Sequence, residues 1–275
     1  MIDLKSVEQS IQSRKAAWQA EENELSQLPD SVFAAMLGST PSSGNLADIA
    51  AASTRAWGLP ASNLPPAHDW RNVDGACRVT DVRNQGPCGS CVSFAVLGAM
   101  EAAARIADEA LKDIDLSEAD LFFGSAATCQ SGMLVEDALR RAQANGVGWE
   151  KDLPYDPRMT LHRAIPPAYR VQSWHHLVSQ SQRKQAIYED GPIIAQMQVF
   201  EDLRVYKSGI YEHVQGQLVG HHAVCVVGYD DTDGCWIVKN SWSAKWGEMG
   251  YLRIKYGQCC IDDAFPSYGL SVEAL

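Results

Sequence analysis

The sequence lacks any long run of apolar residues. Its longest apolar stretches, residues 32–37 and 94–100, are six and seven residues long, whereas a helix that crosses a bilayer needs about 20. The sequence also lacks an excess of positive charge, because 34 acidic residues outnumber 23 basic ones and give a net charge of −11. We therefore expect neither a membrane nor a nucleic acid among its partners.

Little in the sequence marks a cellular compartment. The first thirty residues lack the basic start and the apolar core of a secretory signal. We therefore expect a protein that stays inside the cell, leaves by another route, or has lost its signal. Eight cysteines in 275 residues are too few for a disulfide scaffold and leave the redox environment open.

The overall composition is that of a globular protein. Hydrophobic residues make up 46% of the chain and charged residues 21%, which excludes a disordered chain and fits one sizeable domain or two small ones. No internal repeat is present.

The pattern of residues 4–66 predicts helices joined by loops. Apolar residues from Leu4 to Trp18 recur at helical spacing and predict a first helix that includes Trp18. A second helix is predicted over residues 32–37, closed by Gly38 in a left-handed conformation. A third is predicted over residues 46–57. Residues 59–66 contain three prolines and are the best linker candidate.

Beyond this linker, helices precede strands. Helices are predicted over residues 91–110, from about residue 116, and over residues 135–145. Strands are predicted at residues 193–200, 223–229, 235–239 and 251–255. A helical half followed by a strand half predicts an α+β fold of two subdomains with a cleft between them.

The most informative string is QGPCGSC at residues 85–91, directly before the longest predicted helix. A cysteine at a helix N-terminus faces unpaired backbone N–H groups and the positive end of the helix dipole, which stabilise a thiolate. Cys88 and Cys91 are alternatively a redox or zinc pair. Zinc needs further ligands at suitable spacing, and a redox motif needs a preceding βαβ strand. Neither context is present, so the pattern favours a nucleophile.

A nucleophilic thiol needs a base and a group that orients the base. GHHAVCVVGY at residues 220–229 places a histidine at the start of an apolar strand, and IVKNSW at residues 237–242 supplies an amide. His221 and His222 point to opposite faces of a strand, so only one of them faces the cleft.

These three motifs, in this order, resemble the papain family of cysteine peptidases over residues 66–275. His222 and Asn240 follow Cys91 by 131 and 149 residues, within the roughly 130–150 typical of that family. The resemblance implies a Cys91 nucleophile, a His222 imidazolium partner and an Asn240 amide that orients the ring. Gln85 would supply an oxyanion-hole donor beside the Cys91 backbone N–H.

The family pattern places its catalytic histidine directly before Ala-Val, which selects His222 over His221. It also implies that Trp242 shields the hydrogen bond between Asn240 and His222 from water. The implied architecture is a helical left subdomain and an antiparallel, β-barrel-like right subdomain, with the active site between them. No cofactor and no metal are implied.

Further similarity concerns the substrate. CQSG at residues 129–132 stands where the family has Cys-Asn-Gly-Gly, so Gly132 would offer its backbone to an extended substrate, while Ser131 replaces a glycine. A small alanine at the floor of the second specificity subsite would leave an apolar pocket. This pocket predicts a preference for a bulky apolar residue one position before the scissile residue. The residues expected to line this second subsite are Met133, Leu134, Gly220, Ala223 and Ala264.

The resemblance also implies a disulfide between Cys88 and Cys129, which favours an oxidising compartment. Cys259 and Cys260 are candidate partners of Cys77, and the sequence does not choose among the connectivities of these three and Cys235. The remaining thiol, Cys225, is expected to be a buried small hydrophobe.

The N-terminal segment resembles the short propeptide of cathepsin B-like enzymes, through Trp18-Gln19-Ala20 and a later Leu37-Gly38. The resemblance implies residues 1–64 as an inhibitory segment and residues 65–275 as a peptidase domain. The Trp18 helix would dock on the β-rich subdomain, and residues 37–40 would cross the cleft over Cys91. An ordinary helical decoration is the alternative.

The expected activity is that of a monomeric endopeptidase made as a zymogen, acting on peptides or proteins, because the paired-histidine occluding loop of cathepsin B has no obvious counterpart. A propeptide cut is expected within about residues 57–66. Two alternatives stay open. A catalytically weak peptide-binding relative is suggested by Val92, which replaces the family's aromatic residue, and an acyl or peptidyl transferase would use the same thioester.

Overall fold

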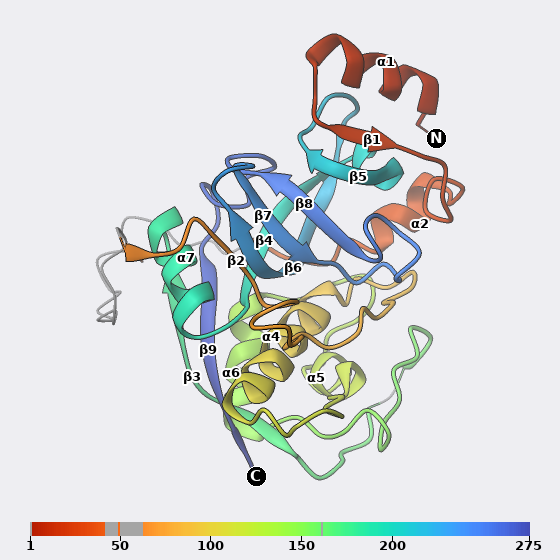
Figure 1. Cartoon of the computed structure of the whole chain (residues 1–275). Coiled ribbons are helices and arrows are strands. Elements are labelled where there is room, and N and C mark those ends of the chain that lie inside the picture. The colour runs from red at the N-terminus through yellow and green to blue at the C-terminus, as the bar shows by residue number, and fades with distance from the viewer. Residues whose placement is uncertain (1, 42–48, 50–62, 161) are drawn as a thin grey trace.

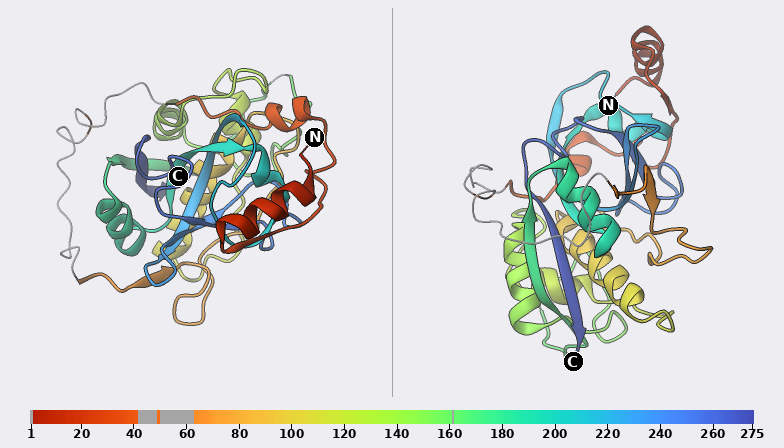
Figure 2. Two further views of the ribbon diagram at one scale, coloured as in Figure 1. Left: turned by 90° about the horizontal axis from the view of Figure 1, so that it is seen from above. Right: turned by 60° about the vertical axis from the view of Figure 1, so that its left-hand side comes forward.

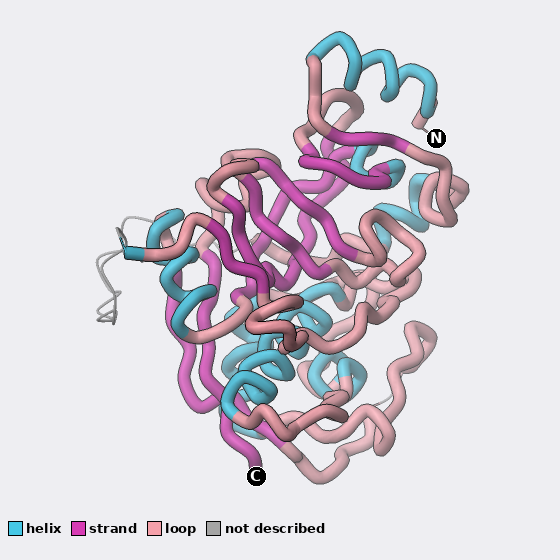
Figure 3. Tube along the Cα trace, viewed as in Figure 1, coloured by secondary structure: helices cyan, strands magenta, loops and turns pink. Residues whose placement is uncertain are grey.

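The computed structural model describes residues 2–41, 49, 63–160 and 162–275. Three helices, α4 (Cys91–Ala107), α5 (Glu118–Phe123) and α6 (Val135–Asn145), gather on one side of the molecule, and most strands lie on the other (Figures 1 and 3). The chain therefore has an α+β fold. None of the helices among these residues is long and apolar enough to cross a bilayer.

The strands form one sheet, whose path among the described residues runs β1-β5-β8-β7-β6-β4-β9-β3, with β2 paired to β6. All pairs are antiparallel except β5 with β8. The strand bounds are β1 (Trp18–Ala20), β2 (Ala67–Asp69), β3 (Tyr169–Leu177), β4 (Ile193–Phe200), β5 (Tyr206–Tyr211), β6 (Leu218–Asp230), β7 (Cys235–Lys239), β8 (Tyr251–Lys255) and β9 (Ser267–Ala274).

Helix α4 is the central element. Thirteen of its seventeen residues are buried, because it packs against β6 and β9 on the sheet and against α5 and α6. Small alanines let these neighbours approach it closely. The long ribbon of β3 and β9 extends down beside α6, so the two subdomains share a strand pair (Figures 1 and 2).

The prediction that the first helix includes Trp18 is wrong. Helix α1 (Leu4–Arg14) stops where Lys15 adopts a left-handed conformation with φ 55° and donates its backbone N–H to Gln12 and Ile11. Trp18 lies in β1, which extends the sheet at β5. The N-terminal segment thus docks on the β-rich subdomain through a strand as well as a helix (Figures 1 and 2).

Gly38 has a different role from the expected helix cap. Helix α2 (Asp30–Ala35) ends at Met36, and Gly38 is not among the residues with positive φ. A side chain at Gly38 would place its Cβ 1.9 Å from the carbonyl oxygen of Gly89. Glycine is therefore needed for close backbone approach. The helix expected at 46–57 lies outside the described residues.

Two further helical elements were not expected from the sequence: α7 (Gln180–Glu189) and the 3-10 helix η2 (Glu201–Val205). A capping box at Ser179 and Gln182 starts α7, so a sequence signal for it was present. The strands β1, β2, β3, β5 and β9 were also missed. By contrast, α6, β4, β7 and β8 have the expected bounds.

The cysteines divide into one disulfide and six free thiols within the described parts of the chain. Cys88 and Cys129 are bonded. The pairing left open between Cys77 and Cys259 or Cys260 is not formed, because all three are free, as is Cys235. Cys225 is buried, and burial raises the pKa of its thiol to about 12.

Candidate active site

Cys91 is the first residue of α4, preceded by the cap residue Ser90. Its thiol is fully buried, and this burial raises its pKa. Hydrogen bonds from the backbone of Ala223 and Gly38 act in the opposite direction. The thiol therefore lies against β6 at the residue that follows His222, and it is covered from the other side by the N-terminal segment.

His222 and Asn240 come from the neighbouring strands β6 and β7, Asn240 standing directly after the end of β7. The atoms His222 Nε2 and Asn240 Oδ1 are 2.8 Å apart. The backbone N–H of Ser241 also donates to Asn240 Oδ1 at 2.8 Å, which marks this atom as the acceptor. The ring therefore carries its proton on Nε2.

The other ring nitrogen, His222 Nδ1, is buried and has no hydrogen-bond partner among the described residues. In a neutral ring with Nε2 protonated, Nδ1 is the free base. Burial lowers the pKa of His222 to about 4, and the Asn240 bond opposes this shift. With residues 36–40 in place, both the thiol and the imidazole are held neutral.

Trp242 covers this pair. Its ring lies 4.7 Å from the His222 ring, centroid to centroid, and Trp246 packs edge-on against it at 4.9 Å. Trp242 is 2% exposed, so the hydrogen bond between His222 and Asn240 is shielded from water. His221 is less buried and meets Phe265 instead, at 5.5 Å between ring centroids.

The Gln85 amide lies between the loop before Cys91 and the N-terminal segment. Its Nε2 donates to the carbonyl oxygens of Cys88 at 2.7 Å and of Met36 at 2.8 Å. Its Oε1 accepts the Ser241 hydroxyl proton at 2.6 Å. Ser241 thus fixes which end of the amide faces the cleft, and a carbonyl of the N-terminal segment occupies the donor.

Two supporting residues were missed in the sequence, Ser241 and Tyr155. The Tyr155 hydroxyl donates to the Gln85 carbonyl at 2.9 Å and lies 2.6 Å from the Ser90 hydroxyl. It thereby joins the two ends of the loop that carries Gln85 and Cys91. Ser241 stands inside the Asn-Ser-Trp motif, which signals it, whereas Tyr155 lies 65 residues beyond Ser90 with no local signal.

The residues expected to bind substrate fall into two groups. Gly132 and Met133 line the path of the N-terminal segment, since Met133 N–H donates to the Gly38 carbonyl at 2.9 Å. Gly132 has φ +60°, and a Cβ there would lie 1.9 Å from the same carbonyl oxygen. Gly220 lies beside Leu37, whose side chain would be 3.2 Å from a Cβ on Gly220.

The other expected residues make different contacts. The Ser131 hydroxyl donates to the carbonyl oxygens of Thr128 and Gly132, its own loop. Leu134 is the half-buried cap residue of α6, and Ala264 is exposed next to Phe265. Ala223 offers its backbone to the Cys91 thiol.

The N-terminal segment crosses the site in a defined direction. Phe33 packs edge-on against Trp242 at 5.5 Å, and Met36 meets Gln85. Gly38 then meets Cys91 and Met133, and Thr40 N–H donates to the Met133 carbonyl at 3.1 Å. The segment therefore runs from Trp242, over Cys91, to Met133.

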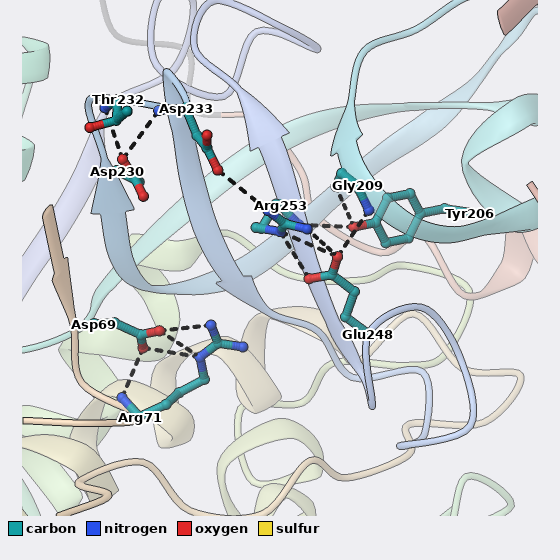
Figure 4. A network of polar contacts seen from close by, with 9 residues as sticks. All are labelled: Asp69, Arg71, Tyr206, Gly209, Asp230, Thr232, Asp233, Glu248 and Arg253. Carbon is teal, nitrogen blue, oxygen red and sulfur yellow. Dashed lines mark hydrogen bonds and ion pairs between the residues drawn. The ribbon is translucent and has the colours of Figure 1, made fainter. Parts of the chain in front are cut away.

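A polar network supports β5, the strand with which β1 of the N-terminal segment pairs. Glu248 accepts hydrogen bonds from Arg253 and from the backbone of Gly209, and the Tyr206 hydroxyl donates to the Gly209 carbonyl (Figure 4). Gly209 is the register partner of Trp18. A Cβ at Gly209 would lie 2.3 Å from the Ala17 carbonyl oxygen, so glycine is needed for β1 to join β5.

Comparisons with known proteins agree with this arrangement. A family model described as papain family cysteine protease matches residues 64–268. Cathepsin B-like cysteine proteinase 2 of Haemonchus contortus is 28% identical, over 78% of this chain and 76% of that protein. The thiol protease aleurain of Arabidopsis thaliana is 34% identical, over 71% of this chain and 57% of that one.

Two solved structures are similar over nearly the whole chain. Procathepsin B S9 from Trypanosoma congolense has a TM-score of 0.84 at 21% identity, covering 100% of this chain and 99% of that chain. A recombinant stem bromelain precursor has a TM-score of 0.76 at 25% identity, covering 98% of this chain and 88% of that chain. The likeness therefore includes the N-terminal segment.

Proposed function

The chain belongs to the papain family of cysteine proteases, and from that membership we propose that it is an endopeptidase made as a self-inhibited zymogen. It is a cysteine-type peptidase. The observations that carry the proposal are a thiol at a helix N-terminus, held against the backbone of the residue that follows His222, and a His222 ring that is oriented by an amide. The proposed working groups are Cys91, His222, Asn240 and Gln85.

The reaction follows from these groups once the N-terminal segment has left. His222 Nδ1 takes the Cys91 proton, and the thiolate attacks the carbonyl carbon of the scissile peptide bond. Gln85 Nε2 and the Cys91 backbone N–H receive the oxyanion that forms. The imidazolium gives its proton to the leaving amine as the C–N bond breaks, which leaves a thioester.

Water then completes the cycle. His222 accepts a proton from water, the resulting hydroxide attacks the thioester carbonyl, and the carbon–sulfur bond breaks. The carboxylic acid leaves, and Cys91 and His222 return to their starting state. Asn240 keeps the ring in the orientation that serves both steps, because its Oδ1 binds Nε2.

Self-inhibition is supported by the contacts of residues 36–40. Met36 supplies a carbonyl to Gln85, and Gly38 lies against Cys91. The solved stem bromelain structure that the chain resembles is a precursor. We assign residues 1–64 to an inhibitory segment and residues 65–275 to the peptidase domain, acting as a monomer on peptide or protein substrates.

The test is to acidify the full-length chain. A cut within residues 57–66 is expected in the wild type and is expected to be absent in Cys91→Ala. Identification of the new N-terminus by mass spectrometry measures it. The same cut in Cys91→Ala would contradict self-processing.

The second subsite is expected to accept a bulky aliphatic or aromatic residue before the scissile residue. Met133 is 7% exposed and Ala223 is 1% exposed, and both side chains are apolar. A peptide library tests this preference, and an optimum at arginine in this position would contradict it. The bonded pair Cys88 and Cys129 supports an oxidising compartment.

A transferase would use the same thioester with an amine in place of water. A thiol-directed epoxide and a dipeptide fluorogenic substrate separate the functions. Labelling of Cys91 together with hydrolysis supports the peptidase. Labelling without hydrolysis favours transfer, and the absence of labelling after activation favours a peptide-binding relative.

A further inference from the structure

Arg204 is a buried cation in the wall of the cleft. It belongs to η2 and is 2% exposed. Burying a charged group is costly unless it is paired. One of its nitrogens is paired by the N-terminal segment, since Arg204 Nη1 lies 2.8 Å from Asp30 Oδ1.

The same segment places an aromatic ring on this cation. The guanidinium carbon of Arg204 lies 4.3 Å from the centre of the Phe33 ring, a favourable cation–π distance. Asp30 and Phe33 stand three residues apart in α2, so they share one face of the helix. One helical face therefore presents both a carboxylate and an aromatic ring to Arg204.

The pairing of Arg204 is incomplete. Its Nε and Nη2 atoms are buried and have no hydrogen-bond partner among the described residues. A guanidinium offers donors in a planar fork that suits bidentate binding of a carboxylate, and Asp30 uses only one nitrogen. The neighbouring acids have their own partners. Glu201 accepts the Gln217 N–H, and Asp202 accepts the Tyr211 hydroxyl.

Arg204 lies on the leaving-group half of the cleft. Phe33 contacts Trp242 as well as Arg204, so a single ring fills the space between the shield of the catalytic pair and the cation. The segment reaches Cys91 and Met133 only afterwards, at Gly38. Substrate residues before the scissile bond are assigned to Gly132 and Met133, so those after it lie towards Trp242 and Arg204.

Space remains beside the cation even with the segment in place. A cavity of about 320 Å³ opens there. Leu218, which is 47% exposed, contributes an apolar wall. The residues that line the cavity are Asp30, Ser31, Phe33, Ala34, Glu201, Arg204, Leu218 and Val219.

The geometry points to Arg204 as a specificity-determining residue that binds a substrate carboxylate within three residues after the scissile bond, next to an apolar side chain seated between Arg204 and Trp242. Asp30 and Phe33 occupy this site in the closed form. An extended chain advances about 3.3 Å per residue, so three residues after the scissile bond span about 10 Å. This assignment rests on the proposed peptidase function.

A carboxylate after the scissile bond has two sources: an acidic side chain, or the C-terminus of a short substrate. Internally quenched peptides separate them. One series places aspartate or isosteric asparagine at the first, second or third position after the bond, with phenylalanine in a neighbouring position. A second series ends two or three residues after the bond as a free acid or an amide.

The experiment uses the full-length chain after acid activation, with active enzyme counted by epoxide titration of Cys91. In the wild type, kcat/KM is expected to be about tenfold higher for the carboxylate peptide than for its amide partner in at least one position. Arg204→Met is expected to bring this ratio to about one, and Arg204→Lys to retain part of it. Lys255→Gln removes an exposed cation elsewhere in the β-rich subdomain and is expected to keep the ratio.

The wild-type ratio alone decides the matter if Arg204→Met fails to fold. Equal hydrolysis of every carboxylate and amide pair by active wild type overturns the assignment and leaves the peptidase function standing. An unchanged ratio in folded Arg204→Met also overturns it. Failure of the activated wild type to hydrolyse any peptide overturns the proposed function, and the assignment falls with it.

Discussion

His222 binds protons weakly in the closed form, in which residues 36–40 cover Cys91. Its pKa lies at about 4 in the closed form, against an ordinary value of 6.5, because burial disfavours the imidazolium. The open form binds the proton more tightly, so protonation shifts the equilibrium towards the open form. The stability of the closed form is full above about pH 6.5 and is lost as the pH falls towards about 4.

We therefore predict that acidification over this range eases opening by ~3 kcal/mol. Hydrogen exchange of the Ser39 and Thr40 amides in a Cys91→Ala background, corrected for its intrinsic pH dependence, measures the opening. His222→Gln, which does not titrate, is the control and is expected to show a flat profile. Equal pH dependence in both proteins would rule out His222 as the cause.

At the scale of elements, three backbone segments meet at glycines. Gly38 approaches Gly89, and Gly132 approaches Gly38, so closely that a Cβ at Gly38 or Gly132 would lie 1.9 Å from a carbonyl oxygen of the facing segment. The loop before α4, the loop before α6 and the N-terminal segment therefore close together only without side chains at this point. The obstacle is backbone, which cannot move aside as a side chain can.

We predict that Gly38→Ala lifts the segment from the cleft. The initial rate of dipeptide hydrolysis by the unprocessed chain at neutral pH is expected to rise by about tenfold or more, because overpacking costs about 1–3 kcal/mol or more. Ala35→Ser changes an exposed residue of α2 and is the matched control. An unchanged initial rate in Gly38→Ala would show that the segment tolerates the added methyl group.

The strand β1 makes the second attachment of the segment. Trp18 is 3% exposed and packs on Tyr211 and Tyr206, with ring centroids 5.1 and 6.2 Å away. We predict that Trp18→Ala weakens docking by about 3–5 kcal/mol. Limited proteolysis within residues 4–20 measures the loss, with exposed Gln12→Ala as the control. Equal protection of both variants would assign docking to other contacts.

At the scale of the whole molecule, the Cys88–Cys129 bond ties the loop before Cys91 to the loop that carries Gly132. It closes a separation of 41 residues, so its removal is expected to lower the free energy of unfolding by ~4 kcal/mol. Urea unfolding of the double variant Cys88→Ser/Cys129→Ser measures this change. Cys77→Ser removes an exposed free thiol and is expected to leave the midpoint unchanged, and an unchanged double variant would contradict the prediction.

The sequence predicts some parts of the molecule because their signals are local. Strands β4, β7 and β8 are apolar runs bounded by turn residues, and α6 ends at a glycine. Trp18 joins a strand because the free edge of β5 pairs with it, and the sequence around Trp18 carries no trace of that edge. Gly38 likewise owes its place to Gly89, 51 residues away.

The site divides in the same way. Cys91, His222, Asn240 and Gln85 stand in short motifs at family spacing, so they can be proposed as the working groups without the structure. Tyr155 acts through contacts with residues 65 and 70 positions away, and Arg204 is defined by the segment that covers it. Such roles depend on packing between distant parts of the chain, so periodicity and motif spacing carry no information about them.

The chain direction of residues 33–40 also determines how activation proceeds over time. They enter at Trp242 and leave at Met133, opposite to the course assigned to a substrate, so the peptide bonds over Cys91 face the thiol backwards. A molecule is therefore not expected to cleave its own residues 33–40 while they are bound over Cys91. Activation is expected to begin with a few opened molecules that cut their neighbours, with a lag that shortens as the protein is concentrated.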